Sequence, residues 1–248
     1  MARHGEDKTQ KRLSVAKTRF FPRKSDTWTV RSIAGAYKKN ESVPLAFVLR
    51  DMLNIAASMW EAKFIATSKD VLVNGKLRED YRFSVGLFDI IDFPKIKKKY
   101  RMVLDSKGRL SLNALDYAAK PEKLCKVKGK KAAKHGKFII STNDGLMIEA
   151  KDAKIPVGAT LKVSLPDHKI LEILEMKKGN LAYVCGGTHA SAVAKISDFV
   201  AGDMLKDEMV FLENEDGKFL TTEKYIFVLG ANKPAIDLGS GAEAKEKQ

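Results

Sequence analysis

Apolar residues after position 44 repeat at the three- and four-residue spacing that places side chains on one face of a helix. Ser42 and Pro44 precede this repeat. A serine hydroxyl can cap the free N–H groups of a first turn, and proline fits that turn because it has no N–H to satisfy. We therefore predict a helix that begins at residues 42–44. Its buried face would comprise Leu45, Leu49, Met52, Leu53 and Ala56.

A second short helix is predicted from Ser58 to about Ser68. Ser58 and Glu61 have the spacing of a capping box, in which each side chain satisfies a free backbone N–H group near the helix start. The bulky apolar residues of this segment are expected to face inward. They are Trp60, Phe64 and Ile65.

Strands and tight turns are predicted from residue 71 onward. Residues 71–73 lead into Asn74-Gly75, and Asn-Gly favours a type I′ hairpin because both residues accept a positive φ. Gly108 and the sequence Asn143-Asp144-Gly145 indicate two further hairpins. Apolar strand-like segments continue through residues 159–176 and 181–228. The pattern predicts an α+β, multidomain chain that is rich in β structure after residue 94.

The 248-residue chain has a net charge of +14, and this charge is distributed unevenly. Residues 1–42 contain 11 Lys+Arg against 4 Asp+Glu, and residues 94–140 contain 15 against 3. Residues 43–93 contain 6 against 7, and residues 180–230 contain 4 against 8. Two clustered basic segments are typical of a nucleic-acid-binding protein. Solvated lysine faces would give the same composition, and an anionic membrane surface is a weaker alternative because the basic segments lack a strong apolar face.

Other classes of site are disfavoured by the sequence. Cys125 and Cys185 form neither a disulfide framework nor a C-x-x-C pair, and the four histidines lie too far apart for zinc spacing. Both cysteines are interpreted as buried small hydrophobic residues or as surface residues without a role. No apolar run reaches the roughly 18 residues of a membrane span, and the first residues lack the apolar core of a secretory signal. We expect a cytoplasmic protein with no metal, cofactor, membrane partner or small-molecule substrate.

Residues 1–42 are predicted to form an extended basic arm that becomes ordered on a partner. Cationic residues alternate there with Phe20, Phe21 and Trp28. Such aromatic residues can stack on exposed bases while the cations neutralise phosphates. The alternative is that the aromatic residues anchor the arm on its own protein. The candidate RNA contacts in the arm are Lys11, Arg12, Arg19, Arg23 and Lys24.

The order of two helices, the sequence VNGK at residues 73–76 and VGLFDII at residues 85–91 resembles the alpha-L RNA-binding module. The resemblance implies that polar and basic residues around the second helix and the hairpin contact RNA. This chain has Met59 where the module usually has a basic residue after the capping serine. An ordinary solvated surface role is the alternative for each candidate. The implied contacts are Ser58, Lys63, Lys69, Asn74, Lys76 and Arg78.

The segment 94–176 is predicted to be a β-rich central domain with basic loops. Two lysine clusters lie within it, at residues 95–101 and 123–137. Lysine-rich loops on a sheet can form a surface for ribose and phosphate groups. The candidate contacts are Lys97, Lys98, Lys99, Arg109, Lys126, Lys128, Lys130 and Lys131.

The sequence KKGNLAYVCGG at residues 177–187, followed by AVAKI, resembles a KOW motif. The resemblance implies a small SH3-like β-barrel that binds RNA or protein. Gly179, Gly186 and Gly187 match the turns of the motif, whereas Ser191 and Ala194 occupy positions where glycine is usual.

The order of the parts, from about residue 11 to residue 236, resembles the S-four-e family of e-type small-subunit ribosomal proteins of archaea and eukaryotes. The short Gly/Ala/Lys/Glu end favours the archaeal form. The predicted domains are a basic arm (1–42), the alpha-L module (43–93), the basic β-rich central domain (94–176), the KOW barrel (177–230) and a tail (231–248).

The resemblance implies a structural constituent of the small ribosomal subunit that binds ribosomal RNA beside neighbouring ribosomal proteins. One alternative is an RNA-modifying enzyme with an alpha-L targeting module, but no GxGxxG follows a strand and no paired catalytic residues are evident. A second alternative is a transient KOW-containing translation or transcription factor, which would not explain the two basic segments. We therefore predict an RNA-binding protein of the ribosome that is not an enzyme.

Overall fold

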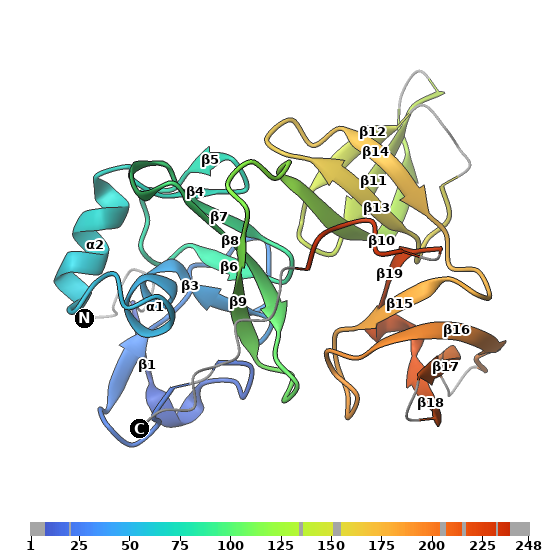
Figure 1. The fold of residues 1–248 in the computed structure, drawn as a ribbon, viewed down its shortest axis with the longest axis horizontal. Helices are drawn as coiled ribbons and strands as arrows, with labels where there is room; N and C mark the ends of the chain where they lie inside the picture. The colour runs from blue at the N-terminus through green and yellow to red at the C-terminus, as the bar shows by residue number, and fades with distance from the viewer. Residues whose placement is uncertain are drawn as a thin grey trace, which may run out of the picture. The chain divides into compact units, whose positions relative to one another are not determined.

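A computed structural model describes residues 8–19, 21–133, 136–150, 155–203, 207–214, 217–231 and 233–238. Phe20, residues 134–135 of the second lysine cluster and most of the predicted tail lie outside these residues. Contacts divide the chain into two compact units. The first contains the described parts of 1–103 and 109–119, and the second contains residues 104–108 and the described parts of 120–238 (Figure 1).

The first unit is built on a five-stranded sheet with the order β5-β4-β7-β8-β9. β7 pairs antiparallel with β8, so the sheet continues across the domain boundary predicted between residues 93 and 94. By their contacts, residues 98–103 and 109–115 of the β8–β9 hairpin belong to the first unit, and residues 104–108 at its turn belong to the second. The strands are β4 (Leu72–Val73), β5 (Lys76–Leu77), β7 (Ile90–Phe93), β8 (Lys98–Leu104) and β9 (Leu110–Leu115), with the short helix η3 (Pro94–Ile96) between β7 and β8.

The first predicted helix begins at Leu45, after the predicted start at residues 42–44. Residues Ser42–Pro44 form strand β3, which pairs with β6 (Ser84–Gly86), and α1 (Leu45–Phe47) continues as the π-helical turn η2 (Val48–Met52). The Ser42 hydroxyl does not cap the helix; it donates to the Lys38 carbonyl at 3.1 Å. Strand pairing with β6 holds residues 42–44 extended and delays the helix. Leu45 and Leu49 are buried, as the helical spacing predicts.

The second predicted helix is α2 (Met59–Thr67), and Ser58 caps it as predicted, whereas Glu61 bonds to the N–H of Ala57 and not to that of Ser58. The Ser58 hydroxyl accepts the Glu61 N–H at 3.2 Å, and the Glu61 carboxylate accepts the Ala57 N–H at 2.7 Å. The buried residues of α2 are Ala62 and Ala66. The inward orientation predicted for the bulky residues is wrong for Trp60 and Phe64, which are 73% and 60% exposed. Two small side chains on the buried face let the helix backbone lie close to its neighbours.

The N-terminal residues are folded onto the first unit. β1 (Thr9–Lys11) pairs antiparallel with β2 (Trp28–Val30), η1 (Arg12–Ser14) follows β1, and the Ile33 N–H donates to the Arg82 carbonyl at 3.0 Å. The Phe21 ring packs edge-on against Phe47, with 5.4 Å between centroids. The prediction of an extended arm is therefore wrong for the described residues, because hydrophobic and backbone contacts anchor this segment on its own protein.

The second unit contains two five-stranded antiparallel sheets. In the first, with the order β12-β11-β10-β13-β14, the long strand β10 pairs with β13 over residues 122–126 and with β11 over residues 127–132. A register shift between Val127 and Gly129 accompanies the change of partner. Cys125, Ile140 and Leu161 lie in its core. The strands are β10 (Glu122–Ala132), β11 (Phe138–Thr142), β12 (Met147–Ala150), β13 (Thr160–Ser164) and β14 (Ile170–Leu174).

The second sheet of this unit has the order β18-β17-β16-β15-β19. Its strands are β15 (Leu181–Val184), β16 (Val193–Val200), β17 (Met209–Asn214), β18 (Gly217–Thr222) and β19 (Ile226–Gly230), and η5 (Glu223–Tyr225) precedes the last. The predicted β-rich character is confirmed.

Three predicted hairpin turns are also present. Asn74 and Gly75 have φ values of 54° and 75°, while Gly108 and Gly145 have φ values of 69° and 75°.

Candidate nucleic-acid interface

The Asn-Gly hairpin is held by a buried carboxylate. Asp89 accepts hydrogen bonds from the Tyr37 hydroxyl and the Asn74 side-chain amide, both at 2.7 Å, and from the Gly86 N–H at 2.8 Å. The Asn74 side chain also accepts the Ile90 N–H at 3.0 Å. Both ends of the Asn74 side chain are therefore occupied within the protein. Its side chain attaches the hairpin to the segment 86–90. These internal hydrogen bonds do not support the RNA contact implied for Asn74.

Gly86 makes room for the Tyr37 ring in this network. A Cβ at Gly86 would lie 2.5 Å from atoms of that ring. Asp89 is almost fully buried, and three donors converge on it, as hydrogen bonding of a buried charge requires. The hairpin is thus presented on a rigid base that includes a residue from the N-terminal segment.

Basic residues near this hairpin differ in their exposure. Lys63 on α2 and Lys76 on β5 are exposed, and the Lys63 ammonium lies 5.9 Å from the Tyr81 ring centroid. Lys69 is exposed and forms an ion pair with Glu79 at 3.2 Å. Arg78 is half-buried, and its guanidinium lies 4.2 Å from the centre of the Phe83 ring. The predicted Ser58 is exposed but serves as the cap of α2.

The arginines of the N-terminal segment are mostly structural. Arg12 is buried; it donates to the Pro22 carbonyl at 2.8 Å and pairs with Asp26 at 2.8 Å. Arg19 is also buried and donates to the Ser42 carbonyl at 3.0 Å. Burial lowers the pKa of Arg19 to about 10. The predicted RNA contacts of Arg12 and Arg19 do not agree with this burial.

The remaining candidates of the N-terminal segment are more accessible. Lys11 on β1 and Lys24 are exposed, and Arg23 is half-buried.

Two exposed basic residues that were not among the predicted RNA contacts lie in the same unit. Arg31 and Lys39 are exposed and line a cavity of about 340 Å³ together with Ser32, Gly35 and Tyr37. All seven residues that line this cavity are basic or uncharged. The short run Ala36–Lys39 beside a glycine was the available signal.

The lysines at the start of β8 are divided in the same way. Lys97 and Lys98 are exposed. Lys99 is half-buried; its ammonium donates to the Tyr117 carbonyl at 2.6 Å and lies 4.6 Å from the Tyr117 ring centroid. The candidate Arg109, just before β9, is half-buried.

Strand β10 contains lysines with opposite roles. Lys126 is buried, and its ammonium donates to the Glu223 carbonyl at 2.6 Å. Burial lowers the pKa of Lys126. Lys128 and Lys131 are exposed, while the half-buried Lys130 lies 4.7 Å from the Phe138 ring centroid. The RNA contact predicted for Lys126 does not agree with its burial.

A buried ion pair in this sheet was not predicted. The Lys123 ammonium contacts the Asp144 carboxylate at 2.5 Å, and the exposed fraction of each side chain is at most 3%. Burial alone would raise the pKa of Asp144, but the Lys123 charge and hydrogen bonds from Lys123, Thr142 and Cys125 lower it. Lys123 is therefore a core residue, although it belongs to a sequence of surface-like lysines.

The described parts of the chain hold no group of three or more His, Cys, Asp and Glu residues that could bind a metal ion. Cys125 and Cys185 are not joined in a disulfide, and the first is buried and the second half-buried. Among the described residues, no helix is long and apolar enough to cross a membrane.

The fold and the exposed lysines place the chain in the class of basic, β-rich proteins assembled from small modules. Residues 96–170 match the model of ribosomal family S4e. A protein of Methanosphaera stadtmanae named small ribosomal subunit protein eS4 is 39% identical over 96% of this chain and 98% of that protein. The protein of the same name from Methanocaldococcus jannaschii is 36% identical over 96% and 100% of the two chains.

A solved structure agrees with these relatives. The crystal structure of the 30S ribosomal protein S4e from Thermoplasma acidophilum has a TM-score of 0.66 and 31% identity, and the similarity covers 78% of this chain and 97% of that one. The chain therefore belongs to ribosomal protein family S4e. This membership confirms the predicted family in its archaeal form and the prediction that the chain is not an enzyme.

Proposed function

We propose that this protein is a structural component of the small ribosomal subunit and binds ribosomal RNA through the alpha-L module and its basic neighbours. The observation that carries the proposal is the near full-length similarity to proteins named small ribosomal subunit protein eS4. Its partners would then be ribosomal RNA and adjacent ribosomal proteins, and it would act on the ribosome in the cytoplasm.

Exposed lysines supply the attraction to phosphate in this proposal. They lie on folded elements, so little conformational entropy is lost in ordering their backbone on binding. Phosphate contacts position a protein on RNA, while the rigid hairpin base around Asp89 would recognise the shape of a folded junction. The proposed set is Lys11, Lys24, Lys63, Lys76, Lys97, Lys98, Lys128 and Lys131.

The sheet of β15–β19 would have a different role. Residues 180–230 contain 4 Lys+Arg against 8 Asp+Glu, so this segment does not attract RNA by its net charge. We interpret it as the KOW barrel and assign to it contacts with neighbouring proteins. This assignment divides RNA binding and protein binding between separate sheets.

A salt titration tests the RNA contacts. We expect the four-fold variant Lys97→Ala, Lys98→Ala, Lys128→Ala and Lys131→Ala to bind small-subunit ribosomal RNA more weakly. The slope of log affinity against log salt should fall by about 0.7–0.9 for each lost phosphate contact. The matched control is Lys195→Ala, an exposed lysine of the acidic segment. An unchanged slope in the four-fold variant would contradict the proposed contacts.

A high-salt wash separates a structural component from a transient factor. A component held by many contacts should remain with small subunits through the wash, whereas a factor should elute. Release of most of the protein would favour the transient factor.

A further inference from the structure

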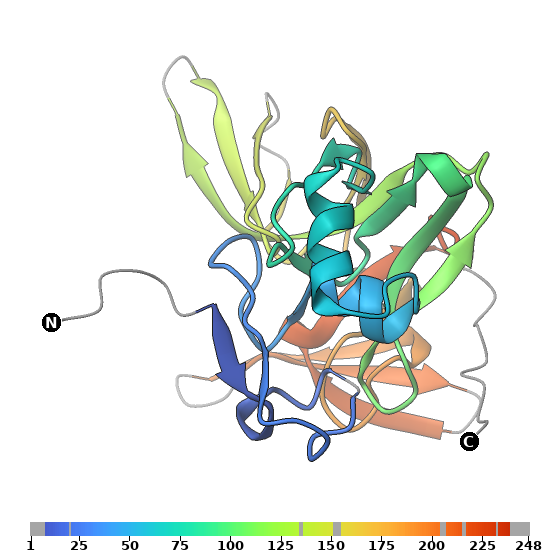
Figure 2. The same ribbon diagram turned by 90° about the vertical axis from the view of Figure 1, so that its left-hand side faces the viewer.

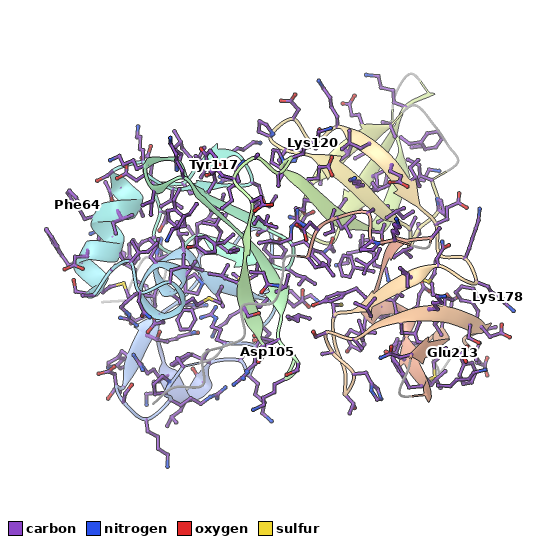
Figure 3. All side chains as sticks on the ribbon, in the orientation of Figure 1. Phe64, Asp105, Tyr117, Lys120, Lys178 and Glu213 are labelled. Atoms are coloured by element: carbon purple, nitrogen blue, oxygen red, sulfur yellow. The ribbon has the colours of Figure 1, made fainter. Side chains whose placement is uncertain are left out.

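The outer face of α2 carries a pair of stacked aromatic rings. Trp60 and Phe64 are four residues apart and therefore lie on one face of the helix. Their ring centroids are 5.8 Å apart and their planes differ by 10°. Ala62 and Ala66 lie on the opposite, buried face. In Figure 3 the Phe64 side chain projects from α2 away from the ribbon, and Figure 2 shows this helix turned toward the viewer.

Exposure of both rings requires an explanation. Large aromatic side chains contribute to stability when they are buried, and a cluster of exposed apolar side chains commonly marks a binding site. Trp60 and Phe64 contribute little to stability in this way, because most of each side chain remains in contact with water. The two rings are stacked on each other in the structure without a partner.

The neighbouring residues indicate which partner fits. Lys63 lies between the two rings in sequence, is exposed, and shares their helical face. Glu61, Thr67 and Ser68 are also exposed, so polar side chains surround the pair. A protein partner that buries apolar surface needs a broader apolar area than two protruding rings. An aromatic pair with an adjacent cation is instead suited to an unpaired base and its phosphate.

We propose that Trp60 and Phe64 form a stacking platform for an unpaired base of the bound RNA, with Lys63 at the adjacent phosphate. This inference rests on the proposed function and narrows it, because it requires a loop, bulge or junction with an unstacked base at α2. A continuous duplex offers no free base face, so it would not occupy the platform.

Intrinsic fluorescence can report on this platform directly. The chain has two tryptophans, so Trp28→Phe leaves Trp60 as the sole tryptophan. We expect small-subunit ribosomal RNA to quench the Trp60 emission and to shield it from acrylamide. Trp60→Phe leaves Trp28 as the reporter and measures the signal of that tryptophan separately, because Trp28 pairs with the proposed RNA contact Lys11 in β1–β2. A Trp28→Phe protein that binds the RNA with an unchanged Trp60 signal would overturn the inference and leave the proposed function intact.

Affinity measurements provide the second readout. Loss of stacking on one base weakens binding about 5- to 150-fold, so we expect Trp60→Ala to lose affinity within this range. Its salt slope should be unchanged because no charge is removed, whereas Lys63→Ala should lower that slope by about 0.7–0.9. The control is Phe199→Ala, an exposed aromatic residue of β16. Thermal unfolding of each variant shows whether the fold is retained.

The remaining outcomes are also decisive. If Trp60 stays open to acrylamide on the RNA but is shielded in assembled small subunits, its partner is a protein and the base-stacking proposal fails. If neither the unchanged protein nor any variant binds the RNA, the proposed function itself fails.

Discussion

The Asn-Gly hairpin region and strand β10 differ in which of their side chains are buried and which are exposed. In the hairpin region the polar residues Asn74 and Asp89 turn inward, while aromatic residues of the adjacent helix α2 face solvent. In β10 the lysines are divided between the core, at Lys123 and Lys126, and the surface, at Lys128. The number of charges in a segment is therefore a poor measure of the charge that it presents to RNA.

The buried pair of the β10 sheet should give the largest effect. Asp144→Ala leaves the Lys123 charge buried without its partner and should reduce the free energy of unfolding by about 3–5 kcal/mol. The double variant Lys123→Met, Asp144→Leu should recover most of this loss. Urea unfolding measures both, and Glu149→Ala, which removes an exposed partner of Lys137, is the control. A small effect of Asp144→Ala would show that the pair is solvated.

The same pair predicts a dependence of stability on pH. The pKa of Asp144 is lower in the folded protein than its ordinary value of about 4. Its contribution is therefore fully present above that value and is lost as the pH falls through the folded-state pKa, because the unfolded chain binds the proton first. The double variant should show a weaker loss of stability in acid. Equal acid sensitivity in both proteins would contradict this assignment.

The hydrogen-bond network at Asp89 should give the next largest effect on stability. Asp89→Ala removes the acceptor of three hydrogen bonds and should cost about 2–4 kcal/mol. Glu79→Ala removes an exposed ion pair with Lys69 and is the matched control. Loss of RNA affinity in Asp89→Ala at a temperature where the protein remains folded would further link the rigid base to binding. Thermal unfolding that is unaltered would exclude the network as a source of stability.

The close approach of Gly86 and Tyr37 predicts a smaller effect. A methyl group at position 86 would clash with the ring, so Gly86→Ala should cost about 1–3 kcal/mol. Tyr37→Ala removes the clashing ring, and the two changes should therefore cost less together than the sum of the single changes. A double-mutant cycle in urea measures this coupling. Additive costs would mean that the ring moves aside without strain.

The smallest effect should distinguish the two kinds of lysine in β10. Lys128→Ala should lower the slope of log RNA affinity against log salt by about 0.7–0.9 with little change in stability. Lys126→Ala should leave the slope unchanged but lower the unfolding temperature, since its ammonium bonds to the Glu223 carbonyl within the protein. The reverse pattern would contradict the division of β10 into core and surface lysines.

Local chemistry was predictable wherever neighbouring residues decide the conformation. Asn74-Gly75 forms its turn because both residues tolerate positive φ, and Ser58 caps α2 because its hydroxyl reaches the Glu61 N–H. The predicted helix start at Ser42 was wrong because strand pairing with β6 overrides the local preference for a helix cap. The inward orientation predicted for Trp60 was wrong because the spacing of residues 60–66 allows either the bulky residues or the alanines to face the core.

The turns, the helix cap, the uneven charge and the family were all predictable from the sequence, since each depends on residue type and spacing. The burial of Arg19 and Lys126 and the exposure of Trp60 became known from the folded chain. The physical reason is that a strand or helix has faces of similar local stability, and long-range packing selects the face that is buried. The candidate interface therefore became clear only when the inward basic residues were separated from the outward ones.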